Sequence, residues 1–108
     1  MKIEFDQNYL EELYCEGTTK NKKYRFQQSV IKQYKKTVDY LKSAHNTEFL
    51  YKLKCLHYEK KCGNLKDIEA VWVNDQYRLE FKSRKEGEEP EIITICTLLD
   101  LSNHYKRK

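Results

Sequence analysis

Residues 68–81 constrain the fold more than any other part of the chain, because they predict two β-strands joined by one tight turn. Runs rich in β-branched and aromatic residues flank Asn74 and Asp75, two residue types that tolerate the left-handed backbone of a hairpin turn. In the second run apolar and charged residues alternate, and a strand sends alternate side chains to opposite faces. We therefore expect one face to lie on a core and Arg78 to point outward from the other.

The residues before the hairpin predict one strand and three helices. Residues 2–5 alternate polar and apolar side chains, as a short strand does. Asp6 is the expected cap of a helix that stops at Gly17, since Asp accepts from first-turn amides and Gly adopts the left-handed conformation at helix ends. Residues 24–43 carry apolar side chains at helical spacing, and a shorter helix is expected near 47–53.

The remaining residues predict further strands of the same sheet. Residues 54–67 lack periodicity and predict an irregular segment, and residues 83–91 predict a charged loop that contains the only proline. Residues 92–99 are apolar on both faces, as expected of a central strand. No linker or internal repeat is present, so we expect one domain over residues 1–108. Its expected class is α+β, with an N-terminal strand and two to three helices packed on a mostly antiparallel sheet.

Composition limits the classes of function. The 108 residues carry a net charge of +4, which suits a nucleic-acid partner and equally suits a basic surface in water. No apolar run has the length of a membrane span and no signal-peptide core is present, so we expect a cytoplasmic protein with no membrane partner. The four cysteines form no C-x-x-C pair, which argues against structural zinc and favours reduced thiols, with Cys96 buried.

Three segments resemble the RelE/ParE toxin superfamily, most closely its HigB-like branch, the "killer protein" toxins of bacterial toxin–antitoxin pairs. Leu56 and His57, followed by lysines and Gly63, are similar to the family's Leu-His-x-x-Lys-Gly segment. Residues 70–81 resemble its central hairpin, in which an Arg precedes the apolar residues of the last strand. Residues 100–105 resemble its closing Asp-Tyr-His-type tail.

The chain departs from the family pattern at two places. Two extra residues separate His57 from the glycine, so either Lys60 or Lys61 takes the position of the family's lysine. In the tail His104 precedes Tyr105, the reverse of the usual order.

The resemblance implies an endoribonuclease that cuts messenger RNA on the translating ribosome and needs neither a metal nor another cofactor. It also implies a HigA-like helix-turn-helix antitoxin as partner. In such a reaction the ribose 2′-hydroxyl attacks the adjacent phosphate and expels the 5′-oxygen, so a base, an acid and a cation are needed. Histidine serves as acid or base near neutral pH, contributing about 100-fold to 10,000-fold. Arginine offers a permanently charged fork to phosphate oxygens.

The resemblance assigns these roles to residues of this chain. Arg78 is the expected phosphate clamp, and because it is expected to face outward, Arg78→Ala should relieve toxicity without harming the fold. His57 is the expected acid or base, and His104 or Tyr105 is its second partner. The lysines expected to bind backbone phosphates are Lys54, Lys60, Lys61 and Lys82.

Structural roles and other functions stay open beside these assignments. Arg78 could instead be an exposed strand arginine that pairs with Glu69 or Glu80. His57 could be a loop histidine that hydrogen-bonds to the backbone. Trp72 is expected to pack in the core or against the sheet. Two other functions fit the pattern: a ParE-like protein that binds DNA gyrase, and a non-catalytic basic RNA-binding domain. The histidines and the arginine favour the nuclease, since gyrase inhibition has no need of acid–base groups.

Overall fold

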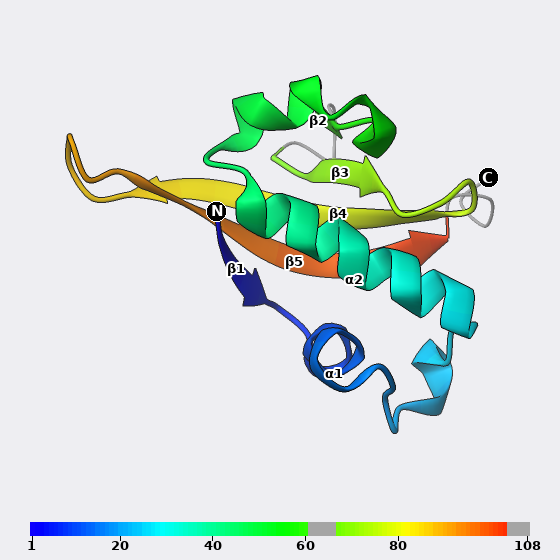
Figure 1. Cartoon of the computed structure of the whole chain (residues 1–108). Coiled ribbons are helices and arrows are strands. Elements are labelled where there is room, and N and C mark those ends of the chain that lie inside the picture. Colours follow the sequence, from blue (N-terminus) through cyan, green and yellow to red (C-terminus); the bar gives the residue numbers. More distant parts are fainter. Residues whose placement is uncertain (61–66, 104–108) are drawn as a thin grey trace.

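A five-stranded mixed sheet forms the centre of the protein in a computed structural model that describes residues 1–60 and 67–103 (Figure 1). The strand order is β1-β5-β4-β3-β2; β1 runs parallel to β5 and the other neighbours are antiparallel. The predicted α+β class with a mostly antiparallel sheet is therefore confirmed. The strands are β1 (Lys2–Phe5), β2 (Glu59–Lys60), β3 (Glu69–Trp72), β4 (Tyr77–Glu86) and β5 (Ile93–Asn103).

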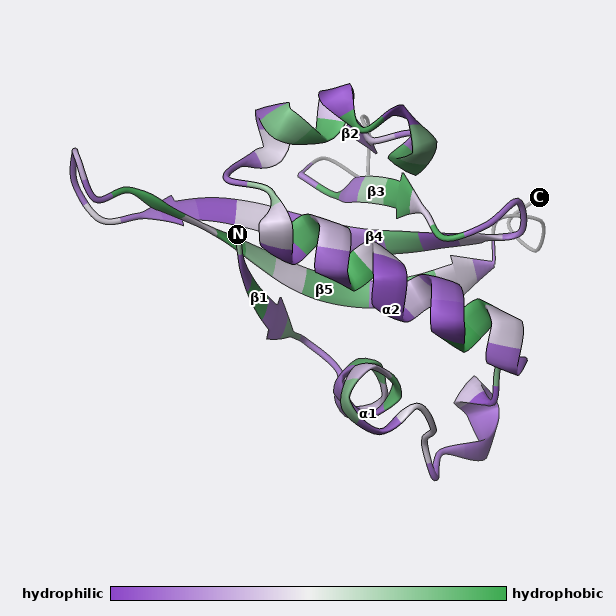
Figure 2. Cartoon of the chain, in the orientation of Figure 1, coloured by the Kyte–Doolittle hydropathy of each residue, from purple (hydrophilic) through white to green (hydrophobic). Residues whose placement is uncertain are grey.

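The described residues form two α-helices and three 3-10 helices. In Figure 1, α2 crosses over β4 and β5, and α1 packs against α2, β1 and β5. Figure 2 shows hydrophilic and hydrophobic residues alternating along α2, as an amphipathic helix requires. None of the helices in the described residues has the length and apolar character needed to cross a membrane. The helices are α1 (Asn8–Glu16), η1 (Lys22–Tyr24), α2 (Gln28–Ser43), η2 (Thr47–Lys52) and η3 (Lys54–Leu56).

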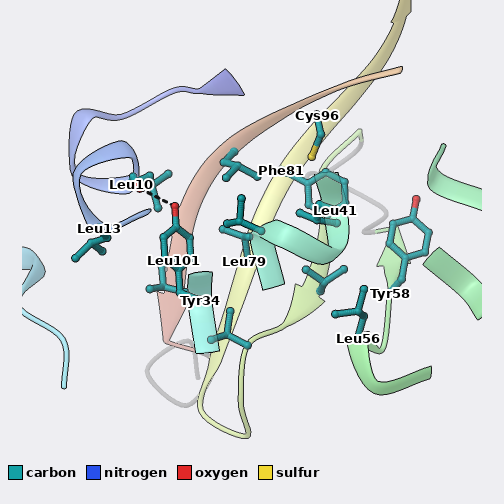
Figure 3. Packing of buried hydrophobic residues seen from close by; sticks show 14 of the residues in the cluster. Leu10, Leu13, Tyr34, Leu41, Leu56, Tyr58, Leu79, Phe81, Cys96 and Leu101 are labelled. Carbon is teal, nitrogen blue, oxygen red and sulfur yellow. Dashed lines mark hydrogen bonds between the residues drawn. The ribbon is translucent and has the colours of Figure 1, made fainter. Parts of the chain in front are cut away.

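The core lies between the helices and one face of the sheet (Figure 3). Tyr34 of α2 and Leu79 and Phe81 of β4 are fully buried, as the helical spacing and the strand alternation predict. Leu56 and Tyr58 extend the same cluster towards η3 and β2. Burial of each such side chain contributes about 1.5–3 kcal/mol, so this cluster is the main source of the fold's stability.

Of the predicted boundaries of α1 and α2, one is confirmed and two are wrong. Gly17 ends α1 as predicted: its φ is +76° and its amide donates to the Leu13 carbonyl at 3.1 Å. Asp6 does not cap the helix, because its amide extends the β1 ladder by donating to the Leu98 carbonyl at 2.9 Å. Residues 24–27 are not part of α2, since η1 forms a separate short turn before the extended residue Gln27.

The second half of the sheet is more regular than the sequence predicts. The irregular segment expected over residues 54–67 holds η3 and β2, which pairs with β3, while residues 61–66 lie outside the described part. The charged loop expected from residue 83 begins only after Glu86, because charged side chains on an exposed strand end reach water while the backbone continues its ladder. Likewise β5 continues to Asn103, beyond the expected end at residue 99.

Candidate functional site

The turn between β3 and β4 sets the position of the residues that follow it. The side-chain oxygen of Asn74 accepts from the amides of Gln76 at 2.9 Å and Tyr77 at 2.8 Å. These bonds imitate a backbone turn and explain why Asn occupies this place. The amide of Val73 donates to the Tyr77 carbonyl at 3.0 Å and closes the hairpin. The first residues of β4 are thereby held in one register.

Arg78 is buried, contrary to the expectation that it stands exposed. It pairs directly with Trp72 across the β3–β4 ladder, and its guanidinium carbon lies 4.1 Å from the centre of the indole ring. Its Nη1 donates to the carbonyls of Asn74 at 2.7 Å, Asp75 at 3.3 Å and Tyr77 at 3.2 Å. These contacts leave Arg78 only 9% exposed. The guanidinium folds back onto its own hairpin. The alternation of side chains along the strand therefore predicts the correct face of the sheet for Arg78, but it does not predict that the side chain is buried.

His57 reaches the same tryptophan from a different part of the chain. It ends η3 with a left-handed backbone, φ +45°, and its amide donates to the Lys54 carbonyl at 3.2 Å. Its exposed ring stacks on Trp72 with a centroid separation of 3.9 Å and an interplanar angle of 25°. A left-handed conformation is uncommon outside glycine, although His is among the residues that tolerate it. The pairing of β2 with β3 brings this turn against the sheet.

His57, Trp72 and Arg78 therefore form one group, called here the Trp72 cluster. It joins an exposed imidazole to a fixed cation through one aromatic ring. A guanidinium has five N–H donors, and the three bonds to the turn use only Nη1. These three bonds fix the guanidinium group of Arg78, and none of them uses the hydrogens of Nε or Nη2. One group able to transfer a proton and one fixed cation therefore contact the same indole ring.

Among the described lysines that were predicted to bind RNA, Lys60 and Lys82 lie away from this cluster. Lys82 lies on the same face of β4 as Arg78, four residues along and therefore about 13 Å away. Lys60 pairs with Glu69, which alternation places on the opposite face from Trp72. The exposed lysine at the start of η3, Lys54, touches the cluster through its carbonyl bond to the His57 amide. The predicted site residues Lys61, His104 and Tyr105 lie outside the described residues.

A second feature, called here the Tyr24 groove, lies at the same end of the sheet. It is a cavity of about 510 Å³ between the segment before α2 and the end of β5. Tyr24 stacks on Tyr9 with ring centroids 3.6 Å apart and an interplanar angle of 3°. The Tyr9 hydroxyl donates to the Asp100 carboxylate and accepts from the Leu101 amide at 3.0 Å. Burial, and then the Asp100 carboxylate, raise the pKa of Tyr9, so the hydroxyl stays protonated as a donor.

The Tyr24 groove was not predicted from the sequence. The signal for it is the run Lys-Lys-Tyr-Arg-Phe at residues 22–26, in which basic and aromatic residues alternate. Such interleaving is typical of single-stranded nucleic-acid surfaces, although polarity and apolar spacing predict only a turn and the start of a helix there. Phe26 is half-buried and forms a T-shaped contact with Tyr77, with ring centroids 5.2 Å apart and an interplanar angle of 86°.

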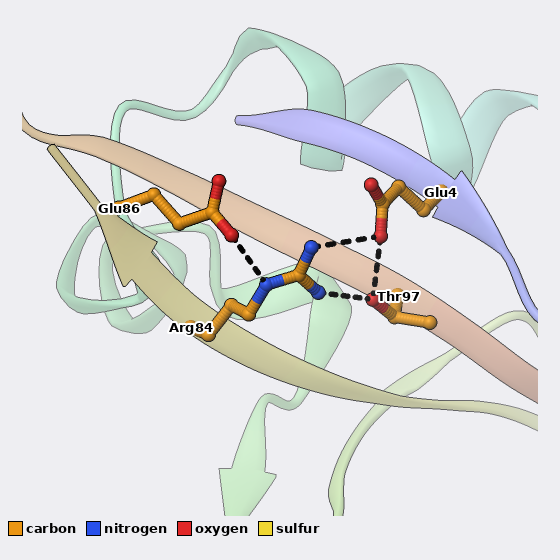
Figure 4. Close-up of polar contacts among 4 residues, drawn as sticks. All are labelled: Glu4, Arg84, Glu86 and Thr97. Atoms are coloured by element: carbon orange, nitrogen blue, oxygen red, sulfur yellow. Dashed lines mark hydrogen bonds and ion pairs between the residues drawn. The ribbon is translucent and has the colours of Figure 1, made fainter.

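Arg84 forms a separate polar cluster on β4 (Figure 4). Its guanidinium lies 3.2 Å from a Glu4 oxygen, 3.1 Å from a Glu86 oxygen and 3.2 Å from the Thr97 hydroxyl. These contacts connect β4 with β1 and β5. With carboxylates on two sides this guanidinium is a poor anion site, and its exposed ion pairs contribute little stability.

Among residues 1–60 and 67–103, no group of three or more His, Cys, Asp and Glu side chains is arranged to hold a metal ion. Neither a protein-family model, nor a curated protein, nor a solved structure matches this chain. A functional assignment for this chain therefore depends on the geometry of its own residues.

Proposed function

We propose that this chain is a ribosome-dependent messenger RNA endoribonuclease, a toxin of the HigB-like kind within the RelE/ParE superfamily. The observation that carries the proposal is the contact of both His57 and Arg78 with Trp72. Two of the chemical functions that RNA cleavage requires thereby lie on one aromatic ring, although the two residues come from different elements. A helix-turn-helix antitoxin of the HigA-like kind is the proposed partner.

The Trp72 cluster supplies groups for cleavage by the 2′-hydroxyl. A bond forms between the 2′-oxygen and the phosphorus, and the bond from phosphorus to the 5′-oxygen breaks. One group takes the proton of the 2′-hydroxyl and another protonates the departing 5′-oxygen. His57, exposed and stacked, takes one of these roles. Arg78, held by the turn carbonyls, stabilises negative charge on the phosphate through the hydrogens of Nε and Nη2.

The burial of Arg78 favours a second candidate, a non-catalytic RNA-binding domain. An arginine that is 9% exposed and donates to three carbonyls has a structural role that needs no substrate. In that case Trp72 and His57 form a stacking surface for bases, and basic residues provide the attraction to phosphates. The two candidates differ in one respect: only the nuclease requires His57 to transfer a proton.

The test is induction of the chain in bacteria, followed by mapping of messenger RNA ends with and without a block on translation. We expect cuts that appear only during translation and that decrease at least about 100-fold in His57→Asn. His45→Asn is the matched control, since His45 is an exposed histidine after α2, and it should cut like the wild type.

Other results of this experiment would select another function. Growth arrest with intact messages would overturn the nuclease and indicate DNA gyrase or another protein target. RNA binding without cuts or arrest would favour the second candidate. Undiminished cutting by a folded His57→Asn protein would remove His57 from the mechanism.

A further inference from the structure

The Tyr24 groove combines aromatic, cationic and acidic side chains in a layered order. Tyr24 and Phe26 are half-buried in its wall, whereas Lys23 and Arg25 are exposed at its rim. Asp100 is also half-buried, and its carboxylate accepts from the Tyr9 hydroxyl. We propose that this groove binds one unpaired nucleotide of single-stranded RNA, with the base inside and its phosphates at the rim.

Tyr24 provides a rigid platform for the base. One face of its ring is covered by Tyr9 at a centroid distance of 3.6 Å, and Tyr9 is fixed in turn by bonds to Asp100 and Leu101. The ammonium of Lys23 lies 5.4 Å from the Tyr24 centroid, on a long side chain that can move aside. A base that stacks on an aromatic side chain gains about 1–3 kcal/mol, and little is lost when the platform is already fixed.

The charges of the groove determine the orientation of the nucleotide. The Asp100 carboxylate repels phosphate but accepts hydrogen bonds from the amino or imino groups on the edge of a base. The cations of Lys23 and Arg25, on either side of Tyr24 in the chain, attract the phosphates that flank a nucleotide. A carboxylate inside the groove and cations at its rim complement a nucleotide, whose base enters and whose phosphates stay outside. A free phosphate ion would require the opposite arrangement.

The size and position of the groove agree with this occupant. Its volume of about 510 Å³ falls within the range of roughly 300–1,000 Å³ usual for small-ligand sites. Tyr77 lines the groove, and its carbonyl accepts from Arg78 of the Trp72 cluster. Ser102, another lining residue, pairs with Arg78 across the β4–β5 ladder. The inference goes beyond the proposed function, because a non-catalytic RNA-binding domain would use the groove equally.

Fluorescence anisotropy with a labelled single-stranded RNA octamer of mixed sequence tests the base platform. Its sugars carry 2′-O-methyl groups, so that no cleavage by the 2′-oxygen takes place. We expect Tyr24→Ala to raise the Kd about 5-fold to 150-fold and Tyr24→Phe to leave it unchanged. Tyr51→Ala is the matched control: Tyr51 is 60% exposed and lies on η2, outside the groove, so the Kd should not change.

Arg25→Gln tests the attraction of the groove for RNA phosphates without disturbing the stack of Tyr24 on Tyr9. We expect weaker binding and a salt dependence reduced by about one counterion, whereas Lys36→Gln, on the exposed face of α2, should leave the salt dependence unchanged. Thermal unfolding shows whether Tyr24→Ala remains folded. Arg25 is exposed, so Arg25→Gln should stay folded, and its affinity tests RNA binding at the groove even if Tyr24→Ala unfolds.

The outcomes separate this inference from the proposed function. Wild-type affinity in Tyr24→Phe, Tyr24→Ala and Arg25→Gln alike would overturn the inference, even if the protein cuts messages. Affinity that depends on Tyr24 in a protein that cuts no messages would uphold the inference and overturn the nuclease. Double-stranded RNA that competes as well as the octamer would also overturn the inference, since a paired base does not enter the groove.

Discussion

Arg78 and Trp72 face each other directly across the β3–β4 ladder, with the guanidinium carbon 4.1 Å from the centre of the indole ring. The cation is therefore held from two directions, by the ring and by the carbonyls of the turn. An arginine fixed in this way loses little conformational entropy when it meets an anion. The same contacts make it part of the hairpin's stability, so that its structural and functional roles need separate tests.

Arg78→Ala should destabilise the protein by about 2–3 kcal/mol, because it removes charge-assisted bonds to three carbonyls and the contact with Trp72. Urea unfolding measures this as a lower midpoint. Arg84→Ala is the matched control: its ion pairs are exposed, and its loss should cost less than about 1 kcal/mol. Equal midpoints for both variants would show that the buried contacts of Arg78 contribute nothing. The burial of Arg78 contradicts the outward-facing position from which the sequence predicts that Arg78→Ala leaves the fold unharmed.

His57→Asn and His57→Val should differ in stability, because the backbone at residue 57 is left-handed. Asn tolerates this conformation, so His57→Asn should stay within about 0.5–1 kcal/mol of the wild type after loss of the stack on Trp72. Val is branched at Cβ and should cost about 1–2 kcal/mol more. Thermal unfolding of the two variants checks the order. A His57→Val protein as stable as His57→Asn would contradict the left-handed geometry.

Local sequence signals predicted those parts of the fold that depend on neighbouring residues. The hairpin follows from Asn74, whose side chain makes the turn bonds, and the end of α1 follows from Gly17. Apolar spacing places the start of α2 too early, because Tyr24 and Phe26 pack on Tyr9 and Tyr77 before the helix begins at Gln28. Apolar spacing does not reveal which partner a side chain has.

The candidate site was predictable only in part, for the same reason. Alternation identifies the face on which Arg78 lies, but its burial depends on Trp72 and on the direction in which the guanidinium folds. The stacking of His57 on Trp72 follows from the two-residue strand β2, which is too short to give a periodic signal. Contacts between distant segments, rather than residue types, bring the cluster together.

Cys96 should resist thiol reagents in the native protein, whereas Cys15 and Cys55 should react. Cys96 is fully buried, and burial raises the pKa of its thiol, so both access and thiolate formation are suppressed. The other two side chains are exposed. Labelling with a maleimide, followed by peptide mass spectrometry before and after denaturation in urea, checks this. Native labelling of Cys96 at the rate of Cys15 would show that β5 opens readily.

Tyr34→Phe should make the stability of the protein less sensitive to alkaline pH. Tyr34 lies in the core (Figure 3), where its hydroxyl donates to the Leu10 carbonyl at 2.7 Å, and burial raises the pKa of this phenol. Above pH 10 the unfolded chain loses the proton while the folded chain retains it. The stabilisation is thus complete below pH 10 and declines as the pH rises, by about 1.4 kcal/mol per pH unit for one group.

The variant loses the hydrogen bond of Tyr34 but also loses the group that titrates. At pH 8 it should be less stable than the wild type by about 1 kcal/mol, and this difference should vanish between roughly pH 10 and 11 as the wild-type curve falls. Urea unfolding at pH 8, 10 and 11 measures the two curves. Tyr51→Phe, at an exposed tyrosine, is the matched control and should follow the wild type. Parallel curves for Tyr34→Phe and wild type would mean that the Tyr34 hydroxyl reaches water in the folded protein, and that the contact between α1 and α2 is looser than the bond to Leu10 implies.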